Sequence, residues 1–229
     1  MGCLSGDKLY QMKIAIFYHI AQMGMSAFIY QQQLHRLYTS GLIEAAEYIH
    51  FGVNGDNKLF NAPDKAVIKQ NSNWKEETET LIDLKNFADR NPNYKILYFH
   101  TKGVSKGTLT VNAWRLMMEY FVIDKWKECV KMLDEYDCVG SNLSPVGETL
   151  WQDGTVTQPV KGTYNFTGTF WWANAKHIQS LNHDFLYSNY RIDRELWIGS
   201  NPNSNPGTLY QPEECDPYME LYNEKDYVK

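Results

Sequence analysis

The sequence lacks the short motifs that mark several large enzyme classes. It contains neither GxGxxG nor GxxxxGK followed by Ser or Thr, so it has no dinucleotide fingerprint and no P-loop. HExxH, the zinc signature of many metalloproteases, is absent as well, and we expect no nucleophile elbow of the hydrolase type. These absences disfavour a hydride-transfer enzyme and a P-loop kinase.

Cysteine and positive charge are also scarce. The four cysteines form no CxxC pair and no Cys/His ligand spacing, which is typical of a reducing compartment, so we expect a cytoplasmic protein with a peripheral membrane location left open. No apolar run approaches the ~18 residues of a membrane span. The net charge of −5 argues against nucleic acid as a partner. A nucleotide ligand is still compatible with this net charge, because one local Lys or Arg is enough to neutralise a diphosphate.

The chain of 229 residues is long enough for one domain with a real core. Residues 1–11 are interpreted as a tag or an N-terminal extension, because Met12-Lys13-Ile14-Ala15 resembles a natural start. Residues 12–229 are predicted to form a single domain, with the last ~25 residues as a peripheral segment.

Short apolar runs alternate with helical patterns along this domain. The predicted strands are residues 13–20, 47–53, 66–69, a fourth from Tyr94, then 137–142 and 166–173, and the predicted helices are 27–38, 76–90 and 110–135. This order predicts an α/β fold with a Rossmann-like central mixed sheet flanked by helices. Residues 143–164 are predicted to be a functional loop because of their length, and residues 201–207 to be irregular.

The fourth strand ends in His100-Thr101-Lys102-Gly103, where an open α/β sheet presents ligand-binding groups. Lys102 can neutralise a diphosphate as a point charge, and His100 can donate to phosphate or ligate a metal. The alternative for His100 is that it only satisfies a buried backbone carbonyl. Tyr18, His19 and Asn54 follow or end the first two strands, so we expect them to meet a base or ribose.

A third segment joins aromatic residues to carboxylates. Phe170, Trp171 and Trp172 suit the apolar faces of an acceptor sugar, and Asp193 or Glu195 downstream can act as a general base. Two adjacent Trp on one strand face opposite sides, so at most one of them belongs to such a platform. The alternative is a core strand followed by solvated charges.

The order of five motifs resembles GT-A-type glycosyltransferases. ILYFHTKG, AWRLMMEY, DCVGSNL, GTFWWANAKHIQSL and RELWIGS are similar to the rhamnan-synthesis glycosyltransferases of bacteria and to glycosyltransferase domains of large DNA viruses of algae. The likeness spans about Lys13 to Ser200. It implies a GT-A-like fold, with Tyr18 and His19 near the nucleotide of a nucleotide-sugar donor, His100 and Lys102 near its diphosphate, and Phe170-Trp171-Trp172 on the acceptor side.

One departure from that fold concerns the metal. Most GT-A enzymes carry Asp-x-Asp after the fourth strand to hold Mn²⁺ or Mg²⁺, and this chain has no Asp-x-Asp. A hard divalent cation prefers carboxylate oxygens, which His-Thr-Lys does not supply. Either Lys102 takes over the neutralising role, which we favour, or a carboxylate from elsewhere completes a weaker metal site.

These observations predict an enzyme that moves a hexosyl or deoxyhexosyl unit, rhamnosyl included, from a nucleotide-diphosphate sugar to a hydroxyl of a glycan. A UDP-sugar is the favoured donor. Glu195 is the favoured base, followed by Asp193 and Asp153, and inversion or retention stays open. The alternatives are a non-catalytic carbohydrate- or protein-binding module and a nucleotidylyltransferase. The latter is disfavoured because only Gly24 follows the first strand, where that class needs a Gly-rich loop.

Overall fold

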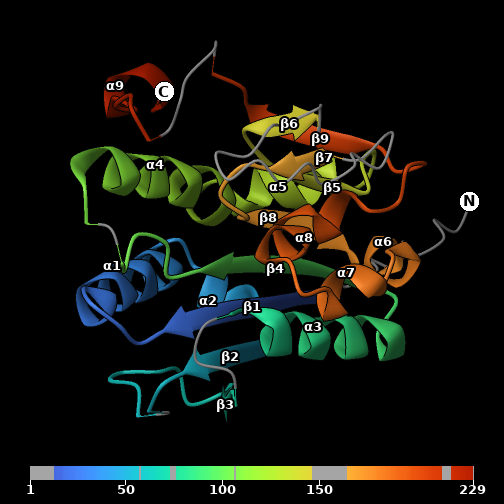
Figure 1. The fold of residues 1–229 in the computed structure, drawn as a ribbon, viewed down its shortest axis with the longest axis horizontal. Coiled ribbons are helices and arrows are strands. Elements are labelled where there is room, and N and C mark those ends of the chain that lie inside the picture. Colours follow the sequence, from blue (N-terminus) through green and yellow to red (C-terminus); the bar gives the residue numbers. More distant parts are fainter. Residues whose placement is uncertain are drawn as a thin grey trace, which may run out of the picture.

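The computed structural model describes residues 13–56, 58–72, 76–105, 107–145, 164–212 and 218–228. A central sheet runs through this part of the chain (Figure 1), with its strands in the order β3-β2-β1-β4-β8-β5-β9. Their bounds are β1 Lys13–Ala21, β2 Tyr48–Asn54, β3 Ala66–Gln70, β4 Tyr94–His100, β5 Cys138–Ser141, β8 Trp171–Asn174 and β9 Pro206–Tyr210. Two short strands, β6 Leu143–Pro145 and β7 Tyr164–Phe166, form a separate antiparallel pair.

The sheet is mixed. β1 pairs in parallel with β2 and β4, and β2 pairs in parallel with β3. β8 is antiparallel to both β4 and β5, and β9 returns parallel to β5. β1 is apolar on both sides because both faces are covered, with Ile16 in one core cluster and Phe17 in the other. The predicted GT-A-like architecture, a mixed sheet flanked by helices in a single domain, is confirmed.

Helices cover both faces of the sheet (Figure 1). The core around Ile16 is completed by α1 Ser26–Thr39, α2 Leu42–Ala45, α4 Leu109–Glu119, the π-helical turn η1 Tyr120–Asp124 and α5 Trp126–Met132. The core around Phe17 is completed by α3 Thr78–Arg90, α6 Ala175–Ser180, α7 Asp184–Tyr187 and the short turn η2 Trp197–Gly199, with α8 Arg191–Leu196 beside α7. None of the helices in the described ranges is long and apolar enough to cross a bilayer.

The helix predicted over 110–135 is interrupted by η1. The wider turn closes with a bond from Lys125 N to Tyr120 O of 3.0 Å, and the Val122 carbonyl accepts the indole N–H of Trp172 at 2.8 Å. A π-turn leaves such carbonyls available to other donors. The interruption therefore gives the buried Trp172 a hydrogen-bond partner, which periodicity alone could not reveal.

One prediction for the C-terminal part differs from the structure. Part of the segment predicted to be irregular forms β9, an edge strand that begins at Pro206, a position where a missing N–H is tolerated. The last residues, where they are described, pack against the core. Tyr222 and Tyr227 are buried in the core cluster of the α1 face, and Tyr227, in α9 Glu224–Tyr227, lies beside the rings of Phe121 and Tyr210.

The aromatic strand predicted over 166–173 is split in two. β7 ends at Phe166, the chain turns through Gly168 at φ +102° and Thr169 at φ +64°, and β8 starts at Trp171. The predicted loop over 143–164 is closed at its base by the β6–β7 pair. Its central residues 146–163, and with them Asp153, lie outside the described residues.

Candidate functional site

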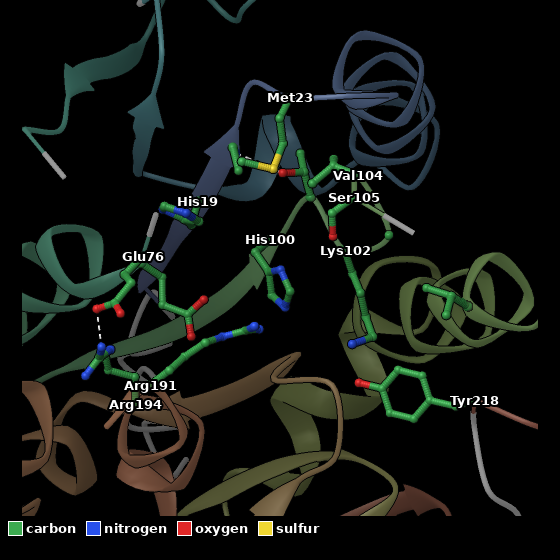
Figure 2. A pocket seen from close by; sticks show the side chains of 15 residues that line it. His19, Met23, Glu76, His100, Lys102, Val104, Ser105, Arg191, Arg194 and Tyr218 are labelled. Carbon is green, nitrogen blue, oxygen red and sulfur yellow. Dashed lines mark hydrogen bonds and ion pairs between the residues drawn. The ribbon is translucent and has the colours of Figure 1, made fainter. Parts of the chain in front are cut away.

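A cavity of about 260 Å³ lies at the carboxyl ends of β1 and β4 (Figure 2). The order of the parallel strands reverses between these two, since β1 leads to β2 on one side and β4 leads toward β8 and β5 on the other. Open α/β sheets bind ligands at such a switch point. The lining residues are His19, Ala21, Met23, Glu76, Glu77, His100, Thr101, Lys102, Gly103, Val104, Ser105, Val111, Arg191, Arg194 and Tyr218.

The end of β4 is held firmly against β1. Thr101 N donates to His19 O at 3.0 Å, and the Thr101 hydroxyl accepts from Ala21 N at 2.9 Å. Gly103 then turns the chain at φ +89°, a conformation that favours glycine. Thr101 therefore holds the end of β4 against β1 through its hydrogen bonds, and this places the neighbouring Lys102 in the cavity.

Lys102 is the cation of this cavity wall. Its Nζ lies 3.8 Å from the centroid of the Trp114 ring, a cation–π contact. Burial lowers the pKa of Lys102 to about 8, against the opposing attraction of Glu195 and Glu77. The ammonium thus stays mostly charged at neutral pH, yet loses its proton more readily than an exposed lysine.

The two histidines are neutral. His100 Nε2 lies 3.0 Å from the carbonyl oxygen of Gly168, so Nε2 carries the proton and donates it. Burial lowers the pKa of His100 well below its usual value, and the charge of Lys102 adds to the effect. His19 Nδ1 lies 2.9 Å from the Thr80 hydroxyl, and burial lowers the pKa of His19 to about 4. His100 thus satisfies a backbone carbonyl through Nε2 while it also lines the cavity, with Nδ1 left as an acceptor.

The opposite wall comes from α8 and from the residues before α3. Arg194 is buried and donates to the Ser188 and Tyr190 carbonyls and to the Glu76 carboxylate, which ties α8 to the start of α3. The side chain of Arg191, 75% exposed, reaches into the cavity in Figure 2 and pairs with Glu195 at 3.4 Å. The cavity therefore holds cations on two walls.

Glu77 is the titratable carboxyl of the site. It lines the cavity just before α3 begins at Thr78. Burial raises the pKa of Glu77 to about 7, and the negative charge of Glu195 adds to the rise, while Arg191, Arg194 and Lys102 oppose it. A carboxyl that titrates near neutral pH can accept a proton from a hydroxyl at working pH.

Several predicted site residues lie elsewhere. Tyr18 is fully buried, donates to Gln33 Oε1 at 2.5 Å and stacks on Phe99, so it is a core residue. Asn54 is buried, donates to Glu76 O at 2.9 Å and accepts from Asn71, so it holds the segment before α3. Both differ from the expectation of nucleotide contact, because strand ends alone do not tell which side chains turn inward.

The predicted acceptor platform is buried as well. Trp171 and Trp172 are nine-tenths or more buried and face opposite sides of the sheet, Trp171 against Tyr98 and Trp172 toward Val122. Phe170 is buried with its ring 5.2 Å from that of His100, edge to face. These three side chains do not offer an exposed platform; the core-strand alternative describes them.

The predicted bases lie on α8 beside the cavity. Glu195 is paired with Arg191 and is near enough to Lys102 and Glu77 to influence their pKa values. Asp193 is on the same helix, and neither lines the cavity in the described part of the chain. Sequence reading missed Glu77, Arg191 and Arg194, although the pair Glu76-Glu77 at the start of a helix was a visible signal.

The side chains at the cavity show whether the described residues can hold Mn²⁺ or Mg²⁺. The described residues contain no group of three or more His, Cys, Asp and Glu side chains placed to hold a metal ion. His100 uses Nε2 toward Gly168, and Glu76 is bound to Arg194. These residues do not fit a Mn²⁺ or Mg²⁺ site, which needs several free oxygen ligands.

The sequence contains GxSxG at residues 103–107, with Ser105 on the cavity wall. β4 ends at His100 and α4 starts at Leu109, so Ser105 does not sit at a direct strand-to-helix turn. No histidine forms a hydrogen bond with it among the residues that the structure describes. It lacks the geometry of a nucleophile elbow.

The Gly168 carbonyl accepts the hydrogen bond of His100. A substitution at Gly168 therefore tests how tightly this wall of the cavity is packed. A Cβ at Gly168 would lie 2.5 Å from Met118 Sδ, in addition to the strain of φ +102°. We expect Gly168→Ala to lower the free energy of unfolding by about 2–4 kcal/mol in urea unfolding followed by Trp fluorescence. Gly41→Ala is the matched control. It has φ +75° and no neighbour within 4 Å, so it should lose only about 1–2 kcal/mol. Equal losses would contradict the steric contribution of Met118.

Solved structures align with most of this chain at low identity. The bifunctional IspDF of Campylobacter jejuni aligns with a TM-score of 0.46 and 11% identity, covering 93% of this chain and 53% of that one, so the chain spans about half its length. A 4-diphosphocytidyl-2C-methyl-D-erythritol synthase aligns at 0.45 and 12%, covering 94% and 95%. The 2-C-methyl-D-erythritol 4-phosphate cytidylyltransferase of Francisella tularensis aligns at 0.44 and 12%, covering 93% and 95%. No curated protein matches the sequence.

One protein family covers most of the chain. The family described as a domain of unknown function, DUF8361, matches residues 22–193. The match begins directly after the end of β1 at Ala21, and it includes the whole of β4, Lys102 after it, and α8 as far as Asp193. Because it extends over more than half of the sequence, the chain belongs to the DUF8361 family.

Proposed function

We propose that the protein is a glycosyltransferase that binds the diphosphate of a nucleotide-sugar donor between Lys102 and Arg191. The observation that carries this proposal is the cavity at the β1–β4 switch point, with a cation on each of two opposing walls. Two cations match the charge of a diphosphate, Lys102 as a point charge and Arg191 as a planar donor of paired hydrogen bonds. The residue order of GT-A-type glycosyltransferases noted above supports the same donor class.

Lys102 takes the role that a metal ion has in most enzymes of this type. A leaving diphosphate must be stabilised as its negative charge grows, and fixed cations in a half-buried site can do this without a metal. The contact with Trp114 holds the Lys102 ammonium in place before the donor arrives. His100 and Thr101 contribute indirectly, since their bonds fix the backbone that carries Lys102.

Glu77 is the proposed base for the acceptor hydroxyl, and Glu195 acts on it from α8. Glu195 was favoured from the sequence, but Glu77 lines the cavity and titrates near neutral pH. The negative charge of Glu195 keeps the Glu77 proton affinity high, which suits a general base. The transferred unit is proposed to be hexosyl or deoxyhexosyl, the favoured donor a UDP-sugar, and the acceptor a glycan hydroxyl that enters past Tyr218.

Donor turnover tests this proposal. The protein is incubated with UDP-, GDP- and dTDP-sugars, and the release of nucleoside diphosphate is followed by chromatography. We expect slow release from at least one donor in water and faster release when an acceptor glycan is added. Binding of a donor without any release would favour the non-catalytic binding module, and neither binding nor release with any donor would reject the transferase.

A further inference from the structure

A second pocket, of about 780 Å³, lies at the edge of the sheet opposite the candidate site. β1 and β4 begin at this pocket, with Lys13 and Tyr94 in its lining, whereas the cavity at Lys102 lies at their carboxyl ends. The seven residues of β4 separate the two places by about 20 Å. A pocket of this size is typical of small-molecule sites, and its distance from Lys102 makes it a separate one.

Lysine dominates the lining of this pocket, although the chain as a whole is acidic. Among the described residues that line it, five are lysines and two are aspartates, a net charge of +3, against −5 for the whole sequence. We call it the lysine pocket, after Lys13, Lys95, Lys127, Lys131 and Lys176. These lysines come from β1, β4, α5 and α6, so the fold gathers positive charge that no short basic stretch of the sequence contains.

Two of the five lysines are neutralised within the protein. Lys95 Nζ lies 2.5 Å from the carboxylate of Asp134, and Lys13 Nζ lies 3.3 Å from that of Glu47. The other aspartate of the lysine pocket, Asp137, accepts a backbone N–H at 2.8 Å through one of its oxygens. The carboxylates at this place therefore account for only part of the positive charge.

The three remaining lysines have no carboxylate partner. Lys127, Lys131 and Lys176 are exposed, and none of them forms an ion pair among the residues that the structure describes. Lys127 and Lys131 are four residues apart on α5, so they lie on the same face of that helix. Like charges at this spacing destabilise a helix. An anion bound between them would remove this repulsion.

We propose that the lysine pocket binds a small molecule that carries three or more phosphoryl groups, held by Lys127, Lys131 and Lys176. Arginine is the usual partner of a planar carboxylate, whereas lysine binds phosphate as a point charge, and no described arginine lines this pocket. A phosphate monoester also carries about −1.5 to −2 charges near neutral pH. Exposed charge pairs contribute little singly, so the ligand needs several such groups. This site does not depend on the glycosyltransferase reaction.

The test uses two probes of this chemistry, myo-inositol hexakisphosphate and tripolyphosphate. Each is titrated into the full chain by isothermal calorimetry at about 0.15 M salt, where contacts between exposed charges are partly screened. We expect the double variant Lys127→Ala/Lys131→Ala to bind both probes about tenfold more weakly than wild type. Lys58→Ala/Lys225→Ala is the matched control, because it removes two exposed lysines outside the lysine pocket and should bind like wild type. Thermal unfolding of each variant confirms that it folds.

Two further titrations separate the lysine pocket from the cavity at Lys102. Lys102→Ala should leave the affinity for hexakisphosphate unchanged, whereas the affinity for UDP, which has only two phosphoryl groups, should depend on Lys102 and not on the lysines of α5. Citrate, with three carboxylates, should bind more weakly than tripolyphosphate. The absence of binding for both probes would overturn the proposal, as would equal affinity in wild type and the α5 double variant, a loss in Lys102→Ala instead, or citrate that binds as tightly as tripolyphosphate. These outcomes are independent of whether sugar transfer occurs.

Discussion

Lys102→Ala is expected to weaken the binding of nucleoside diphosphates by about 10- to 100-fold, because a charge-assisted contact to phosphate is worth about 1.5–3 kcal/mol. The substitution removes a half-buried ammonium that lies 3.8 Å from the centroid of the Trp114 ring. Few other side chains can move to supply a charge at that place. Isothermal titration of wild type and variant with the same diphosphate measures the effect. Lys176→Ala, an exposed lysine at the start of α6 that is not part of the cavity, is the control and should bind like wild type.

The pH dependence of diphosphate binding is a second test of the role of Lys102. Because the pKa of Lys102 is about 8, its charge is lost as the pH rises through that value, and diphosphate affinity should fall with it. Lys102→Arg keeps a charge to much higher pH, so its affinity should decline at a more alkaline pH than that of wild type. Unchanged affinity in Lys102→Ala, or an alkaline decline that is the same in Lys102→Arg, would place the diphosphate elsewhere.

Glu77→Gln is expected to leave donor binding within about twofold of wild type and to reduce sugar transfer by about 10²- to 10⁴-fold, the usual contribution of a general base. The amide fills the same space but cannot take a proton. The rate of transfer should rise as the pH increases through about 7 in the wild type, since Glu77 acts only when it is deprotonated. That rise should disappear in Glu77→Gln.

Glu195→Gln distinguishes the role of Glu195 from that of Glu77. Removing its negative charge takes away a repulsion that raises the pKa of Glu77, and it also frees Arg191. Both changes lower the pKa of Glu77, so the rise in rate should shift to lower pH while transfer continues. If instead Glu195→Gln abolishes transfer and Glu77→Gln retains it, Glu195 is the base, as the sequence first indicated.

The parts of the fold that sequence reading predicted are those set by local patterns. β1, β2 and β4 are apolar runs of strand length, and α3 has a clear helical period, so these elements are located to within a few residues. Lys102 and His100 could be placed at the candidate site because His100 ends a buried strand and Lys102 lies just beyond it. The reversal of strand order that makes this strand end a binding edge is a general property of α/β sheets.

The parts that could not be predicted depend on contacts between distant segments. Arg194 meets Glu76 across 118 positions of sequence, and this contact ties α8 to the segment that carries Glu77. No local pattern records such a pairing. The aromatic residues were ambiguous for another reason. Trp171 and Trp172 suit a sugar platform and a core equally by composition, and only the helices on both faces of the sheet decide that they are buried.

Nucleotide binding without a metal tests the central claim most directly. The wild-type protein is screened by thermal shift against UDP, GDP, dTDP and CMP, each in EDTA and again with Mn²⁺. If Lys102 and Arg191 together hold the diphosphate, at least one nucleoside diphosphate should raise the melting temperature in EDTA, with little further gain from Mn²⁺ and no response from CMP, which lacks a diphosphate. Stabilisation that appears only with Mn²⁺ would contradict the replacement of the metal by Lys102, and no shift under any condition would contradict the donor site itself.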